Sequence, residues 1–106
     1  MAANRRLTPM AVGSLAFGSL LAAYANLLAS VQGRGIILIF TNTLNSDCTI
    51  SLDGGTTDSL ILPAGQGLVL DLSANDAEFS GTIQAKRGPS GASTVGQINC
   101  SVIRVL

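Results

Sequence analysis

The side chains that could carry chemistry are few, and the sequence contains no histidine. Histidine is the usual residue for proton transfer near neutral pH, so acid–base and nucleophilic sites built on it are excluded. The acids Asp71, Asp76 and Glu78 offer the carboxylates that a glycosidase would need. With one Tyr, three Phe and no Trp to line a sugar subsite, we interpret these acids as solvated loop residues. The sequence therefore predicts a protein that is not an enzyme.

The segment around Asp53, Gly54 and Gly55 is the strongest turn signal in the chain. A nucleophile loop would need a histidine base, and a calcium loop would need a ladder of acidic ligands that is absent here. An Asp-Gly pair between two alternating apolar runs is typical of a β-hairpin. We expect these three residues to reverse the chain, with Asp53 accepting hydrogen bonds from nearby backbone N–H groups.

The two cysteines, Cys48 and Cys100, allow two interpretations. One disulfide between them would close a loop of about 50 residues and stabilise the fold by roughly 4 kcal/mol. Both also lie on the apolar side of expected strands, where a free cysteine behaves as a small hydrophobic residue. We favour free buried thiols. Two soft ligands without histidine do not make a zinc site, and we expect no metal and no cofactor.

Short β-type runs, each ended by Gly, Pro, Asn or Asp, follow one another from residue 35 to the end of the chain. Such spacing is typical of an antiparallel β-sandwich or barrel. We therefore predict an all-β fold of about seven or eight short strands. The expected strands are 36–41, 48–52, 59–62, 68–72, 79–86 and 97–105. The residues expected in the core are Ile36, Leu38, Phe40, Ile50, Leu52, Leu70 and Ile83. The length supports one domain, which we place at residues 13–106.

The stretch from residue 7 to residue 33 carries no charge and follows Arg5 and Arg6. A basic start and an apolar middle are also typical of a secretory signal, and the stretch is long enough to be weighed as a membrane span. It is interrupted by Pro9, Gly13 and other helix-weakening residues. Residues 19–29 could form an amphipathic helix, but we favour strands across residues 13–32. Residues 1–12 are expected to be an extended N-terminal arm.

The formal net charge is zero, which argues against a nucleic-acid partner. All the acids lie in the middle of the sequence, between basic residues near the two ends. Basic segments of one copy could therefore meet acidic loops of another, although acids also collect in turns for local reasons. The candidate subunit contacts are Arg5, Arg6, Leu7, Lys86 and Arg87.

Residues 34–106 resemble small virion proteins of tailed bacteriophages. The resemblance rests on the run SLDGGT, the turn PAG, the strand LVLDL, and the later segments FSGTIQAKRG and SVIRVL. The resemblance implies a non-enzymatic β-sandwich of the particle, in capsid decoration, neck or tail. Its implied partners are copies of itself and the major capsid, neck or tail protein, with no nucleic acid and no membrane. Its implied location is the virion, assembled in the host cytoplasm. The alternative is an exported surface-binding β-sandwich with a signal or anchor at residues 1–25.

Overall fold

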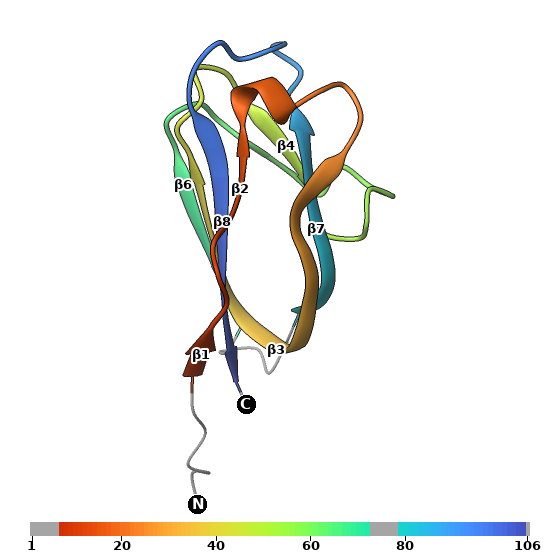
Figure 1. Ribbon diagram of the computed structural model, residues 1–106, viewed down its shortest axis with the longest axis vertical. Coiled ribbons are helices and arrows are strands. Elements are labelled where there is room, and N and C mark those ends of the chain that lie inside the picture. The colour runs from red at the N-terminus through yellow and green to blue at the C-terminus, as the bar shows by residue number, and fades with distance from the viewer. Residues whose placement is uncertain (1–6, 73–78, 106) are drawn as a thin grey trace, which may run out of the picture.

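The computed structural model describes residues 7–72 and 79–105, and these form an antiparallel β-structure (Figure 1). Within these ranges the only helical segment is one 3-10 turn, η1 (Phe17–Ser19). The expected all-β fold is confirmed. The eight strands are β1 (Leu7–Pro9), β2 (Gly13–Ala16), β3 (Ala25–Asn42), β4 (Cys48–Ser51), β5 (Leu60–Leu62), β6 (Gly67–Asp71), β7 (Phe79–Arg87) and β8 (Gln97–Val105).

Strand β3 is long enough to belong to two layers. Its first half pairs with β7, from Ala25 opposite Ala85 to Gly35 opposite Phe79. Its second half lies between β8 and β6, with Phe40 opposite both Cys100 and Leu68. One layer therefore has the order β6-β3-β8, with β1 and β2 end to end along the other edge of β8, and the other has the order β3-β7-β4-β5. This is the two-sheet arrangement of a jelly roll.

The six strands expected from residue 36 onward are all present, with ends that agree to within one or two residues apart from the longer β3. In the apolar N-terminal stretch the strand interpretation is confirmed for residues 13–16 and 25–32, whereas residues 17–24 form η1 and the link into β3. Residues 13–16 pair with β8, and the alternative of a helix over residues 19–29 is wrong. Asn26 and Leu28 instead join the ladder with β7, because backbone pairing with a neighbouring strand outweighs a modest local helical preference.

The described part of the expected N-terminal arm lies along the sheet. Leu7–Pro9 pairs with β8 as β1, and the N–H of Met10 donates to the carbonyl of Val102 at 2.9 Å. These residues are extended and dock on β8 of their own chain. No helix of the described residues is long and apolar enough to cross a membrane.

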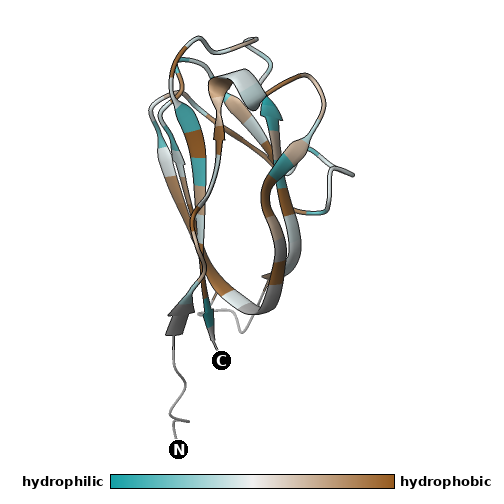
Figure 2. Cartoon of the chain, in the orientation of Figure 1, coloured by the Kyte–Doolittle hydropathy of each residue, from teal (hydrophilic) through white to brown (hydrophobic). Residues whose placement is uncertain are grey.

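The core lies between the two layers and is almost entirely aliphatic. Of the expected core residues, Leu38, Phe40, Ile50 and Ile83 are buried. Leu52 and Leu70 pack against this core but are only partly buried, since one follows the end of β4 and the other lies in the outer strand β6. Ile36 is also half-buried. The alternation of apolar and polar residues along β8 is visible in Figure 2.

Asn42 is a buried polar residue at the end of β3, with 1 % of its surface exposed. Its side-chain amide donates hydrogen bonds to the carbonyls of Leu62 and Pro63, at 3.0 and 3.1 Å, and more weakly to that of Ser46. Its side-chain oxygen accepts a hydrogen bond of 2.8 Å from the N–H of Leu44. One side chain thus bonds backbone groups of two loops, including the buried carbonyl of Leu62 and the buried N–H of Leu44.

The turn after β4 is built around Asp53. Its carboxylate accepts hydrogen bonds from the Ser51 hydroxyl at 2.7 Å, from the Thr57 N–H at 2.9 Å and from the Thr57 hydroxyl. Gly54 and Gly55 have φ angles of 72° and 90°, a region that side-chain-bearing residues rarely adopt. The hydrogen bonds from Thr57 and Ser51 lower the pKa of Asp53 to about 2.

Replacing Phe40 with alanine should lower the free energy of unfolding by about 3–5 kcal/mol, because the ring is fully buried. The matched control is Ile61→Ala, since Ile61 is 52 % exposed and surface changes cost about 0.5 kcal/mol or less. Denaturant unfolding followed by circular dichroism measures both. A loss below about 1 kcal/mol for Phe40→Ala would contradict its burial.

Asp53→Asn should remove part of the acid sensitivity of the fold. A carboxyl group with a lowered pKa in the folded state stabilises the protein above its unfolded pKa of about 4. That stabilisation is lost as the pH falls through about 2. We expect the variant to be less stable than wild type at pH 7, with the difference shrinking toward pH 2.

Thermal unfolding between pH 7 and pH 2 tests this, with Thr57→Val as the matched variant that keeps the carboxylate and loses one hydroxyl donor. Thr57→Val should reduce the pH dependence only in part. Parallel stability curves for Asp53→Asn and wild type would contradict the assignment.

Candidate functional site

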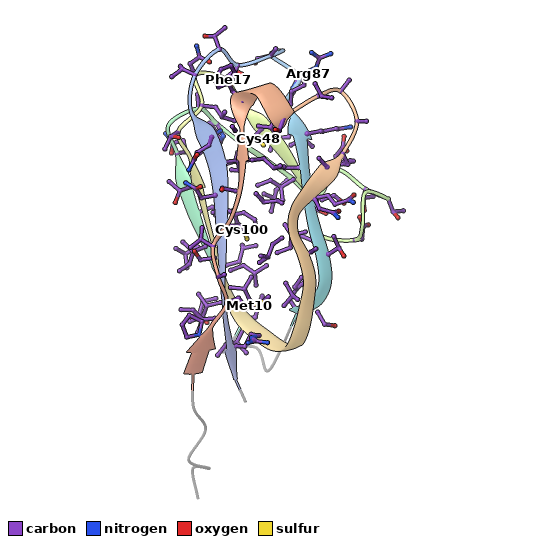
Figure 3. The ribbon with its side chains drawn as sticks, in the orientation of Figure 1. Met10, Phe17, Cys48, Arg87 and Cys100 are labelled. Atoms are coloured by element: carbon purple, nitrogen blue, oxygen red, sulfur yellow. The ribbon has the colours of Figure 1, made fainter. Side chains whose placement is uncertain are left out.

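The candidate contact residues lie at opposite ends of the molecule. Leu7 begins β1, where its backbone is opposite Val105 of β8, beside the C-terminal end of that strand. Lys86 and Arg87 end β7, and Figure 3 places Arg87 at the far end from β1. Arg5 and Arg6 lie outside the described residues. The structure therefore does not bring Leu7 together with Lys86 and Arg87.

Lys86 is already engaged within the chain. Its ammonium lies 3.3 Å from a carboxylate oxygen of Asp58 and 4.6 Å from the centre of the Tyr24 ring. The Tyr24 hydroxyl donates a hydrogen bond to the same carboxylate. Burial raises the pKa of Tyr24 above its usual range, and the hydrogen bond to Asp58 adds to this. The hydrogen bonds from Tyr24 and Lys86 lower the pKa of Asp58.

This Tyr24–Asp58–Lys86 cluster joins three segments that are distant in sequence: the link into β3, the loop before β5, and the end of β7. The sequence did not reveal it. Tyr24 is the only tyrosine in the chain, but nothing in its local pattern indicates a partner 34 residues away. The cluster reduces what Lys86 can offer to another copy, because the Lys86 charge is paired with Asp58.

The Arg87 side chain is more available than that of Lys86 for contact with another copy. It is exposed, and the described part of the chain places no carboxylate within ion-pair distance of it. Its backbone N–H donates to the carbonyl of Leu21 at 3.0 Å, which holds the end of β7 against the link into β3. An open depression of about 290 Å³ lies beside it. The lining residues are Ala22, Thr49, Asp58, Ile61, Lys86, Arg87, Gly88 and Pro89.

The remaining acids act mainly within turns. Asp47 accepts hydrogen bonds from the N–H and hydroxyl of Ser90, at 3.2 and 3.1 Å, and so ties the loop after β7 to the start of β4. Asp53, Gly54 and Gly55 form the turn described above. Of the three acids considered for glycosidase chemistry, Asp76 and Glu78 lie outside the described residues. Among the described residues no cluster of three His, Cys, Asp or Glu side chains could hold a metal ion.

Cys48 and Cys100 are free and have no exposed surface, as expected from their apolar side in the strands. Figure 3 shows Cys48 nearer the Arg87 end of the molecule than Cys100. Burial raises the pKa of each thiol to about 12, and the charge of Asp47 adds to the shift at Cys48. The thiolate is the reactive form of cysteine, so both thiols stay protonated and unreactive near neutral pH.

The exposed surface carries large apolar side chains from several elements. One pair lies at the Arg87 end, where the N–H of Phe17 donates to the carbonyl of Gly96, next to Val95. Another is Val69 in the middle of β6, which is 60 % exposed. The full set is Val12, Phe17, Leu21, Ile61, Val69 and Val95. Single exposed apolar residues are common on protein surfaces, and these six lie on loops, on η1 and on outer strands.

Comparison with known proteins gives a likeness of fold. No family model and no curated protein matches the chain. Among solved structures, the chain is similar to one from the Bacillus endospore appendages, which are described as a novel family of disulfide-linked pili. The two share 14 % sequence identity, with a TM-score of 0.56, over 98 % of this chain and 92 % of that chain. At this identity the likeness establishes a shared β-sandwich fold.

Proposed function

We propose that this chain is a non-enzymatic structural subunit that assembles with copies of itself and with other proteins of a particle. The observation that carries the proposal is its surface, where exposed apolar side chains lie on loops and outer strands at several separate points. Contacts of this kind are individually modest, and an assembly sums them over many copies.

The fold is compatible with such a role. Jelly rolls occur in viral capsid proteins, and the structural neighbour described above comes from a pilus. Viral capsids and pili are both assemblies of protein subunits. The support is by analogy of fold, which raises the expectation of assembly without identifying the particle.

The particle that we propose is the virion of a tailed bacteriophage, where the subunit would serve in capsid decoration, neck or tail. The segments that resemble phage virion proteins fall on consecutive elements of the chain, which the fold divides between its two layers. SLDGGT forms the end of β4 and its turn, PAG forms the turn between β5 and β6, and LVLDL is β6 with Leu72. The partners would be further copies of this chain and the major capsid, neck or tail protein.

Contacts between copies would be non-covalent. Both cysteines are buried between the layers, so neither thiol can reach another copy without opening the core. The structural neighbour, by contrast, comes from pili that are disulfide-linked. In this respect the proposed assembly differs from that neighbour, because its stability would come from packing and hydrogen bonding.

The alternative is an exported β-sandwich whose first 25 residues are a signal or anchor, which the uncharged apolar stretch favours. Removing these residues would take β1 and β2 away from β8 and uncover the outer edge of that strand. The structural-subunit proposal keeps both strands in place. Mass analysis of the native protein separates the two, since export predicts the loss of the N-terminal segment.

Assembly is tested by sedimentation velocity and negative-stain electron microscopy of the purified full chain at rising concentration. We expect species larger than the monomer. Raising the salt should weaken them only in part, because exposed ion pairs are worth about 0–1 kcal/mol each and apolar contacts are not screened. The triple variant Arg5→Gln, Arg6→Gln, Arg87→Gln should lose the salt-sensitive part, and Thr56→Gln is the uncharged control.

A monomer at every concentration would contradict the proposal. If assembly is equally strong in low and high salt and the triple variant assembles like wild type, the electrostatic contribution is contradicted. Apolar burial and backbone pairing would then be the basis of assembly.

The assembled protein should migrate as a monomer in denaturing electrophoresis without reductant, since its thiols are buried and protonated. Reductant should also leave the sedimentation profile unchanged. The variant Cys48→Ala, Cys100→Ala should assemble like wild type, provided that it remains folded by circular dichroism. Reductant-sensitive bands of higher mass in the wild type would show that a covalent link contributes.

A further inference from the structure

Strand β6 presents an open backbone edge. Among the strands that the structure describes, β6 pairs with β3 alone. The N–H of Leu72 donates to the carbonyl of Ile36 at 2.7 Å, and the N–H of Asn42 donates to the carbonyl of Gln66 at 2.9 Å. The even-numbered residues of this segment therefore direct their backbone groups toward β3. Because backbone groups alternate in direction along a strand, Gly67 and Val69 point their N–H and C=O groups away from the sheet.

The other outer strands are less suited to accept a partner. In β1, Pro9 has no N–H, and a proline on an edge strand is a common protection against added strands. The first half of β3 has register shifts at Asn26, Leu28 and Val31, and such bulges twist an edge away from regular pairing. β2 has four residues and β5 has three, so each offers fewer backbone groups than β6. By contrast, β6 pairs in unbroken register over five residues and contains neither Pro nor Lys.

We propose that β6 binds β6 of a second copy, antiparallel and related by a two-fold axis at Val69. In this register Val69 faces Val69 of the second copy as a hydrogen-bonded pair, in which each residue donates its N–H and accepts at its C=O. The same edge serves both copies, as a two-fold contact requires. The layer β6-β3-β8 then continues from one copy into the next. This inference deepens the proposed function, on whose self-association it rests.

The side chains of β6 suit this register. Val69 lies on the outer face and is 60 % exposed, so the two valines would cover each other. Asp71 falls opposite Gly67 of the second copy, two residues from the axis, so no acid faces an acid directly across the pair. Leu68 and Leu70 stay on the inner face, where they already pack against the core. Pairing therefore needs no rearrangement of the monomer.

The first test is cross-linking of the full chain as Val69→Cys. Residues in a hydrogen-bonded antiparallel pair have Cα atoms about 5.5 Å apart, within the range of about 4.4–6.8 Å that a disulfide spans. Mild oxidation at low protein concentration should give a covalent dimer. Val95→Cys is the matched control, since Val95 is 55 % exposed and lies outside β6. Equal cross-linking of both variants would overturn the proposed register.

The second test is Val69→Pro, followed by sedimentation velocity. The Val69 N–H points away from β3, so proline removes a donor for the second copy without breaking the β3–β6 ladder. Loss of the dimer, with assembly retained by Val69→Thr, supports the proposal. If circular dichroism shows that Val69→Pro is unfolded, Val69→Lys replaces it. This variant should also lose the dimer, because two ammonium groups would face each other across the axis.

The outcomes separate this contact from the wider proposal. If wild type associates and both Val69→Pro and Val69→Lys associate equally well, the β6 contact is wrong and the assembly function stands. If wild type is monomeric at every concentration, both the β6 contact and the proposed assembly function are wrong.

Discussion

The backbone ladder of β3 organises the whole fold. This one strand pairs with β7 in its first half and with β8 and β6 in its second, so it holds the two layers together through its own continuity. Its larger register shifts lie in the first half and allow the strand to bend, as Figure 1 shows. A straight β3 would leave the layers unable to face each other across the aliphatic core.

Polar groups in this fold serve mainly to complete its turns. Asn42 supplies partners to the carbonyls of Leu62 and Pro63, and Asp53 gathers the donors of Ser51 and Thr57. The thiols are enclosed by the same layers, which keeps them protonated. The proposed contact with other subunits uses the exposed apolar residues and the outer edge of β6.

The placement of the proposed contacts bears on the geometry of the proposed assembly. Leu7 and Arg87 lie at opposite ends of the molecule, while Val69 lies on the outer edge of a layer. Contacts at two ends join copies along the long direction, whereas an edge contact joins them side by side. Under the proposed function, a subunit with both kinds of contact extends an array in more than one direction.

Most strands and turns could be predicted from local sequence, because alternation of apolar residues and the preferences of Gly, Pro and Asp act between near neighbours in the chain. The run at residues 36–41 and the turn at Asp53 were identified in this way. Long-range pairing was needed to establish how residues 13–16 and 25–35 join the sheet, that Tyr24, Asp58 and Lys86 meet, and that β6 is an outer strand. These features depend on contacts between distant segments, whose backbone hydrogen bonds are alike for every residue type and so leave little trace in the local sequence.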